Sequence, residues 1–194
     1  MKLAEVCREA GVKARAAFRA RFWCHETDFP YDCVSESRDA QDAWVDASIR
    51  PNALIALAVD PSLFEEWQAR AIVARVKAEL LTPRGIRSLS PHDPRYVSQF
   101  AGTLAEKELA YHQGTAWTHL LGFYVRAAIR VAPDDEELRE ELRQVIEGAL
   151  DGSVILGQIA QLADGDMPHR ARGCPAQATS VAELIRALVV DLGV

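Results

Sequence analysis

Apolar residues recur at helical spacing along most of this chain, and the helical stretches are of two kinds. The first kind carries an apolar stripe with a period of about 3.6 residues among charged residues, which predicts amphipathic helices with one side in water. The second kind is richer in small and apolar residues and has few charges, which is typical of helices buried on most sides. Amphipathic helices are predicted over residues 3–22, 61–81 and 133–150, and buried helices over residues 51–59, 115–131 and 175–192.

The two kinds of helix alternate, and the buried helices start roughly 60 residues apart, which indicates an architectural repeat. An irregular polar segment precedes each buried helix, over residues 23–50, 82–114 and 152–174. Helical hairpins that alternate between an outer and an inner ring describe an α/α toroid. Since a complete toroid of six hairpins has twelve helices, the pattern predicts an all-α fold of about half an (α/α)6 barrel, with short irregular or β-hairpin loops at one mouth.

A half ring leaves the first and last inner helices with exposed apolar flanks. The helical pattern also begins at Leu3 without a capping residue before it. We therefore expect a partner chain that supplies the other half, self-association of this chain, or a longer gene product. Residues 1–194 are expected to form a single, partial domain.

Composition narrows the function classes. Apolar residues make up 49% and charged residues 26% of the chain, which is typical of a globular protein. The net charge of −6 argues against nucleic-acid binding, and no apolar run reaches the roughly 18 residues of a membrane span. The four cysteines form no CxxC pair, so we expect no zinc site and a cytoplasmic protein with free thiols.

Polar and aromatic residues gather where the second predicted buried helix begins. The aromatic faces of Tyr111 and Trp117 are suited to stacking on a sugar ring, and His112 and Gln113 are suited to hydrogen bonding with its hydroxyls. The alternative is that these residues pack in the core while Thr115 caps the helix. The cluster as a whole favours a binding site, whereas Trp117 alone favours packing.

A second group flanks the first buried helix. Arg50 and Asn52, after Asp46, are placed to bind a carboxylate or a substrate hydroxyl, or else Asp46 and Arg50 form a pair that fixes the helix start. Both alternatives remain open. His112 and His119 are seven residues apart, which places them on one helical face, and this pair favours a structural role. The sequence contains no GxSxG, P-loop or HExxH motif.

The segment 157–178, GQIAQLADGDMPHRARGCPAQA, is a long polar loop of the kind that is usually functional or disordered. Together with DASIRPN, LLTPRGIRSLSPHDPRY and AYHQGTAW, it resembles the C-terminal domain of glycogen debranching enzymes of the amylo-α-1,6-glucosidase type. The resemblance runs from about Ala17 to Leu192. It implies an (α/α)6 barrel that hydrolyses α-1,6-linked glucose at glycogen branch points, with an α-glucan or oligosaccharide as ligand and no metal or cofactor.

The resemblance further implies an inverting reaction that uses two carboxyl groups. The general acid of the family lies upstream, in a Trp-x-Asp-Ala-Lys type motif. WVDA at 44–47 imitates this motif, but its Asp46 belongs to DASIRPN, so the acid is expected to be absent. The family carries its general base as the Glu of a Gly-x-Ile-x-Glu pattern, where this chain has Gln161, which cannot accept the proton.

Two carboxylates, Asp164 and Asp166, remain in this loop. Either is a substitute base, or both hold sugar hydroxyls or cap the loop, with Arg172 bound to them. His169 and Gln177 complete the expected ring of substrate contacts. Three functions follow: the second half of a debranching-type catalytic domain, an inactive remnant that binds glucan, or a helical scaffold that pairs with another protein.

Overall fold

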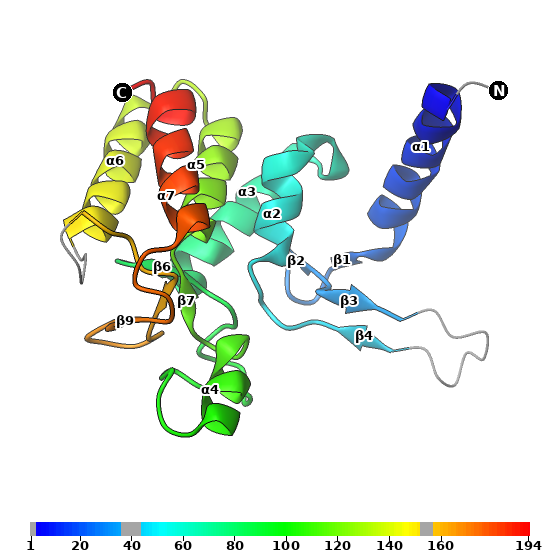
Figure 1. Ribbon diagram of the computed structural model, residues 1–194. Helices are drawn as coiled ribbons and strands as arrows, with labels where there is room; N and C mark the ends of the chain where they lie inside the picture. The colour runs from blue at the N-terminus through cyan, green and yellow to red at the C-terminus, as the bar shows by residue number, and fades with distance from the viewer. Residues whose placement is uncertain (1–2, 36–43, 152–156) are drawn as a thin grey trace.

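The computed structural model describes residues 3–35, 44–151 and 157–194 (Figure 1). The expected polar segments 23–50 and 152–174 therefore include residues 36–43 and 152–156, which lie outside the described residues. The described part is mostly helical, with the α-helices α1 (Leu3–Arg21), α2 (Asn52–Val59), α3 (Glu66–Arg75), α4 (Leu104–Tyr111), α5 (Leu120–Val131), α6 (Glu136–Asp151) and α7 (Ala178–Arg186). Shorter helical turns join them: η1 (Pro61–Leu63), η2 (Val76–Leu80) and η3 (Ala187–Leu192).

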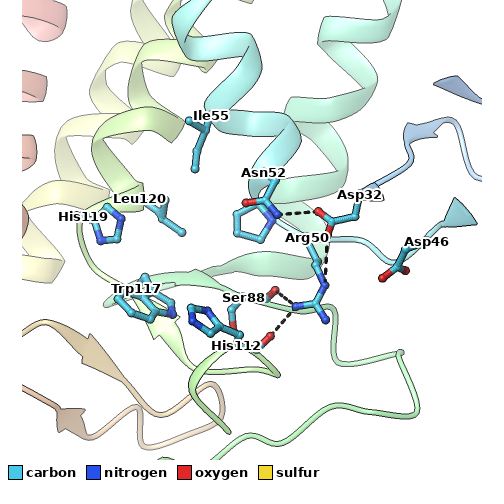
Figure 2. Close-up of a pocket in the computed structure, with 11 residues that line it drawn as sticks. Asp32, Asp46, Arg50, Asn52, Ile55, Ser88, His112, Trp117, His119 and Leu120 are labelled. Atoms are coloured by element: carbon cyan, nitrogen blue, oxygen red, sulfur yellow. Dashed lines mark hydrogen bonds and ion pairs between the residues drawn. The ribbon is translucent and has the colours of Figure 1, made fainter. Parts of the chain in front are cut away.

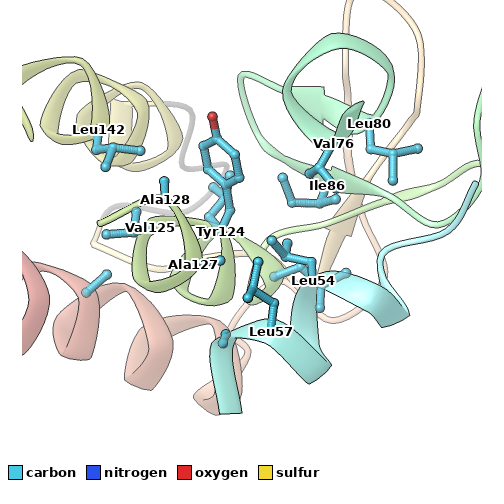
Figure 3. Close-up of a cluster of buried hydrophobic side chains, with 14 of the residues drawn as sticks. Leu54, Leu57, Val76, Leu80, Ile86, Tyr124, Val125, Ala127, Ala128 and Leu142 are labelled. Carbon is cyan, nitrogen blue, oxygen red and sulfur yellow. The ribbon is translucent and has the colours of Figure 1, made fainter. Parts of the chain in front are cut away.

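The three helices predicted to be buried lie in one row. Helix α5 is the middle of the row and packs against α2 on one side and α7 on the other. Helix α3 packs against both α2 and α5, and α6 packs against α5 and η3. Figure 3 shows the centre of the core, where side chains of α2, α5 and α6 meet those of η2 and β6. The largest of these buried side chains include Leu54, Leu57, Leu80, Ile86, Tyr124 and Leu142.

The loops that enter the row of helices come together in one small antiparallel sheet. Its strand order is β5 (Leu81–Thr82), β6 (Gly85–Arg87), β7 (Ala116–Trp117), β8 (Leu162–Ala163) and β9 (Ala171–Arg172). In the register of the sheet, Ile86 pairs with Trp117 and Trp117 with Leu162. Gly85 permits this close pairing, since a Cβ there would lie 2.7 Å from the carbonyl carbon of Trp117. Segments up to about 90 residues apart in the sequence thus share one sheet.

Two further hairpins precede the first helix of the row. They pair β1 (Trp23–Cys24) with β2 (Phe29–Pro30) and β3 (Cys33–Val34) with β4 (Val45–Asp46). The second hairpin carries Asp46 to the start of α2, and the backbone N–H of Asp32 donates to the carbonyl of Asp46 over 2.7 Å. The β-hairpin loops that the sequence predicted are therefore present.

The structure corrects the expected helices in three respects. The stretch 115–131 begins as strand β7, so that the helix starts only at Leu120. Helix α4 lies inside the segment expected to be irregular, where Thr103 and Glu106 form a reciprocal capping box at its start. The third correction concerns α7 and η3, which are not buried on most sides. They expose Ile185, Val189 and Val190 because α5 and α6 cover only one flank.

Helix α1 spans Leu3–Arg21, which confirms the helix predicted over residues 3–22. It lies apart from the row of helices in Figure 1. None of its residues is buried. It contacts η1 and the residues around it, where Arg15 pairs with Asp60 over 3.0 Å and the ring of Phe18 meets that of Phe64. No helix among the described residues is long and apolar enough to cross a membrane.

Candidate functional site

A pocket of about 540 Å³ opens where the loops entering α2 and α5 meet (Figure 2). This volume is typical of small-molecule sites, which span about 300–1,000 Å³. Aromatic side chains of the α5 entrance lie on one side, and charged and amide side chains of the α2 entrance lie opposite them. The residues that line the pocket are Asp32, Asp46, Arg50, Pro51, Asn52, Ile55, Ser88, His112, Trp117, His119 and Leu120.

Arg50 connects the two entrances. Its guanidinium donates to the carbonyls of Ser88 over 3.0 Å and His112 over 2.5 Å, and to Oε1 of Gln113 over 2.8 Å. Its Nε lies 3.7 Å from Oδ2 of Asp32, and its side chain is only 12% exposed. The guanidinium of Arg50 is therefore held in place by other groups of the protein, and it forms a rigid part of the pocket wall.

Two carboxylates lie on the same side as Arg50. Asp32 accepts a hydrogen bond from Nδ2 of Asn52 over 2.7 Å. Asp46 accepts hydrogen bonds from the backbone N–H and the hydroxyl of Ser48, and its Oδ1 lies 3.6 Å from Nη2 of Arg95. Burial acts to raise the pKa of Asp46, but the Ser48 hydrogen bonds and the Arg95 charge outweigh it and lower that pKa. Asp46 is thus an acceptor for hydroxyl groups rather than a proton donor at neutral pH.

The rings of His112, Trp117 and His119 form the opposite wall, and the ring of Tyr111 packs against them. The rings of Trp117 and His112 are nearly parallel, with centroids 5.6 Å apart and an interplanar angle of 8°. Tyr111 and His119 meet Trp117 edge-on, at 4.6 and 5.6 Å between centroids. The indole Nε1–H donates to the carbonyl of Tyr111 over 3.1 Å, which fixes the orientation of Trp117. The wall therefore presents a rigid aromatic surface.

Gln161 does not line the pocket, but it contacts Tyr111, which packs against the aromatic wall. Its Nε2 donates to the hydroxyl of Tyr111 over 2.8 Å, and its Oε1 accepts from the backbone N–H of Cys174 over 3.1 Å. Gly173, the residue before Cys174, has a positive φ, a backbone conformation that favours glycine. A Cβ at this position would lie 2.5 Å from Oε1 of Gln161. The loop is therefore shaped around the amide of Gln161.

Asp164 does not line the pocket. It is 4% exposed, and its carboxylate accepts from Nε and Nη2 of Arg172 at 2.9–3.1 Å and from the backbone N–H of Phe100 at 2.9 Å. The ring of Phe100 in turn lies 5.7 Å from that of Tyr111. These contacts favour a structural role, in which Asp164 fixes the conformation of the loop, rather than a role as a substitute base.

The remaining loop residues also lie outside the lining of the pocket. Asp166 accepts from the hydroxyl of Tyr96 over 2.8 Å, and the buried ring of His169 contacts the carbonyl of Asp164 through Nδ1. Gln177 precedes α7, where its backbone N–H donates to the carbonyl of Ile159. Of the predicted contacts, four line the pocket: Arg50, Asn52, His112 and Trp117. Tyr111 and Gln113 join them through direct contacts.

Seven of the eleven residues that line the pocket were not predicted as contacts, and they include Asp32 and His119. Asp32 lies 18 residues before Arg50, and no local spacing signals that the β3–β4 hairpin brings it back to α2. The expected helical pair of His112 and His119 is wrong, since His112 follows α4 and His119 precedes α5. Burial lowers the pKa of His119, against an opposing effect of Glu183, so its imidazole is neutral at pH 7.

The described residues contain no group of three or more His, Cys, Asp or Glu side chains arranged to hold a metal ion. The pocket instead combines an aromatic wall with side chains that donate and side chains that accept hydrogen bonds. Such a combination is suited to a ligand with apolar faces and several hydroxyl groups, as in a sugar ring.

Comparison with known proteins agrees with this chemistry. The sequence family described as amylo-alpha-1,6-glucosidase matches residues 5–186. The glycogen debranching enzyme of Saccharomyces cerevisiae is 33% identical over 88 residues, which cover 42% of this chain and 6% of the yeast protein. The matched region is thus a small part of the length of this curated relative.

Proposed function

The chain belongs to the amylo-α-1,6-glucosidase family, and from this premise we propose that its pocket binds the terminal glucose of an α-glucan branch. The observation that carries the proposal is the pair of stacked rings of Trp117 and His112, which lie on the other side of the pocket from Arg50 and Asn52. The pocket between them has a volume of about 540 Å³. A pyranose ring stacks its apolar C–H face on an indole, while its hydroxyls take hydrogen bonds from the opposite wall.

The proposal includes the larger architecture. We propose that the row of α2, α5 and α7, with α3 and α6 packed behind it, is part of an α/α toroid, and that residues 1–194 act as one partial domain. The packing of α5 between α2 and α7 supports this arrangement. The pocket would then open at the mouth of the ring, because the entrances of α2 and α5 line it.

Catalysis in the proposed glucosidase needs two carboxyl groups, one to protonate the leaving oxygen and one to activate water. Gln161 occupies the position of the expected base, and an amide cannot accept the proton. We therefore propose that this chain binds glucan without hydrolysing it alone, and that the general acid comes from another part of the domain. Glucose release from branched limit dextrin by the purified chain would contradict this proposal.

Gln161 also favours the second candidate, a glucan-binding module without catalysis. Both candidates require sugar binding in the pocket, and they differ in whether an added partner half restores hydrolysis. A helical scaffold that binds only another protein predicts no sugar binding at all. A titration with glucan oligosaccharides therefore separates the scaffold from the first two.

Replacing Trp117 with alanine is expected to weaken binding of an α-glucan oligosaccharide by about tenfold, which corresponds to ~1.4 kcal/mol. The change removes the apolar surface on which the sugar stacks. Isothermal titration calorimetry of the two proteins measures the difference in Kd. Trp67→Ala is the matched control, since Trp67 lies outside the lining of the pocket and is 50% exposed. Equal losses in both variants would remove the basis for the site.

A further inference from the structure

A second, smaller hollow lies beside the pocket, and we name it the second hollow. Its lining comes from the end of α1, from strand β2 and from the first turns of α2. Its volume is about 80 Å³, which is well below the roughly 300–1,000 Å³ of a small-molecule site. The second hollow can therefore take part of a ligand but not a whole one.

Three residues line both the pocket and the second hollow: Asp32, Arg50 and Asn52, which we name the dividing wall. Nδ2 of Asn52 donates to Oδ1 of Asp32 over 2.7 Å, and Nε of Arg50 lies 3.7 Å from Oδ2 of Asp32. The charges of Asp32 and Arg50 therefore compensate each other. The exposed amide of Asn52 has a second N–H and an acceptor oxygen beyond its bond to Asp32. The dividing wall is thus suited to the hydroxyls of a neutral ligand.

The rest of the second hollow is apolar and largely aromatic. The rings of Phe18 and Phe22 are stacked, with centroids 4.7 Å apart and an interplanar angle of 13°. The backbone N–H of Tyr31 donates to the carbonyl of Phe22 over 2.7 Å, which holds these two residues together. The hydroxyl of Tyr31 is hydrogen-bonded with the thiol of Cys24, so Tyr31 contributes its ring to the lining.

We propose that the second hollow is a subsite for the second glucose of a bound α-glucan, next to the terminal glucose in the pocket. It combines aromatic rings with a polar wall, and this combination is suited to a sugar ring, which has apolar C–H faces and an edge of hydroxyls. Because the two cavities share three residues, one glycosidic linkage spans the dividing wall. The small volume agrees with this role, since it takes one edge of the second ring and leaves the other edge in solvent.

The lining argues against two other kinds of ligand. A purely apolar ligand, such as an acyl chain, would take the carboxylate of Asp32 and the amide of Asn52 out of water without offering them a hydrogen bond. An ionic ligand would find the charges of Asp32 and Arg50 already compensated. The inference rests on the proposed function, because it takes the terminal glucose to lie in the pocket.

Comparison of two sugars tests the proposal on the full chain. Methyl α-glucoside carries the terminal glucose without a second ring, and isomaltose carries both rings. The unmodified chain is expected to bind isomaltose about tenfold more tightly, through the contacts of the second ring with aromatic side chains. Ala53→Leu fills the second hollow at a residue that does not line the pocket. This variant is expected to keep the Kd of methyl α-glucoside and to lose the preference for isomaltose, as measured by NMR titration of the ¹⁵N-labelled chain.

Ala74→Leu is the matched control, because it makes the same change at an exposed position of α3 outside both cavities, and it is expected to keep the preference. Phe22→Ala removes a ring of the second hollow instead of filling it, and it decides the case if Ala53→Leu also weakens binding of methyl α-glucoside. Equal affinity of the unmodified chain for the two sugars, or a preference that survives both Ala53→Leu and Phe22→Ala, would overturn the proposal and leave the proposed function intact. A chain that binds neither sugar would overturn both.

Discussion

Changing Gln161 to glutamate is expected to raise glucose release by about 10²–10⁴-fold when the chain is combined with the acid-bearing half of a hydrolysing family member, since general base catalysis contributes rate factors of this size. The surroundings of Gln161 are suited to the new carboxylate. The backbone N–H of Cys174 already donates to Oε1, and the hydroxyl of Tyr111 is free to turn and donate to the other oxygen. Two hydrogen bonds to the carboxylate favour its charged, proton-accepting form.

The measurement is the release of glucose from a branched limit dextrin, with each variant at the same concentration of the added half. Gln158→Glu is the control, because it makes the same chemical change at an exposed position of the same loop. Equal rates for Gln161→Glu and the unmodified chain would show that position 161 is not the position of the base.

Replacing Asp164 with alanine is expected to lower the free energy of unfolding by about 3 kcal/mol, because removal of one partner of a buried ion pair leaves the other uncompensated. Arg172 would lose its bidentate partner, and the backbone N–H of Phe100 would lose its acceptor. Arg172 is 29% exposed and is partly compensated by water, which places the expected loss at the lower end of values for buried pairs.

Urea denaturation followed by circular dichroism measures this loss. Asp166→Ala provides the comparison two residues away, since the Asp166 side chain is 52% exposed and a loss below about 1 kcal/mol is expected there. If the two variants unfold at the same urea concentration, Asp164 does not hold the loop, and its assignment as a substitute base regains support.

Hydrophobic periodicity predicted the helices well where one side of a helix meets the core. In α6 the predicted inner face is confirmed, with Leu142 and Ile146 fully buried. The amphipathic pattern over residues 61–81 is less reliable, because Trp67 is an apolar residue of this pattern and is 50% exposed in α3. Over residues 175–192, the low number of charges predicted a buried helix, whereas the structure exposes Val189 and Val190 of η3. Periodicity reports that a face is apolar, and it does not report whether the same chain covers that face.

The pocket was predictable in part. Sequence motifs placed Arg50, Asn52, His112 and Trp117 at two helix entrances, and the structure brings these entrances together. The sheet that does so is built from strands of two or three residues, which are too short to give an alternating pattern. For the same reason the sequence gives no sign that the loop residues Asp164 and His169 lie outside the pocket lining.

The central claim, that the pocket at the α2 and α5 entrances binds α-glucan, is tested most directly by two-dimensional NMR of the ¹⁵N-labelled chain. The chain has four tryptophans, Trp23, Trp44, Trp67 and Trp117, and each gives one indole N–H signal. On titration with isomaltose, we predict that the Trp117 signal shifts in a saturable manner while the other three stay in place. A spectrum in which Trp117 does not move at millimolar isomaltose, or in which another indole moves instead, would contradict the claim.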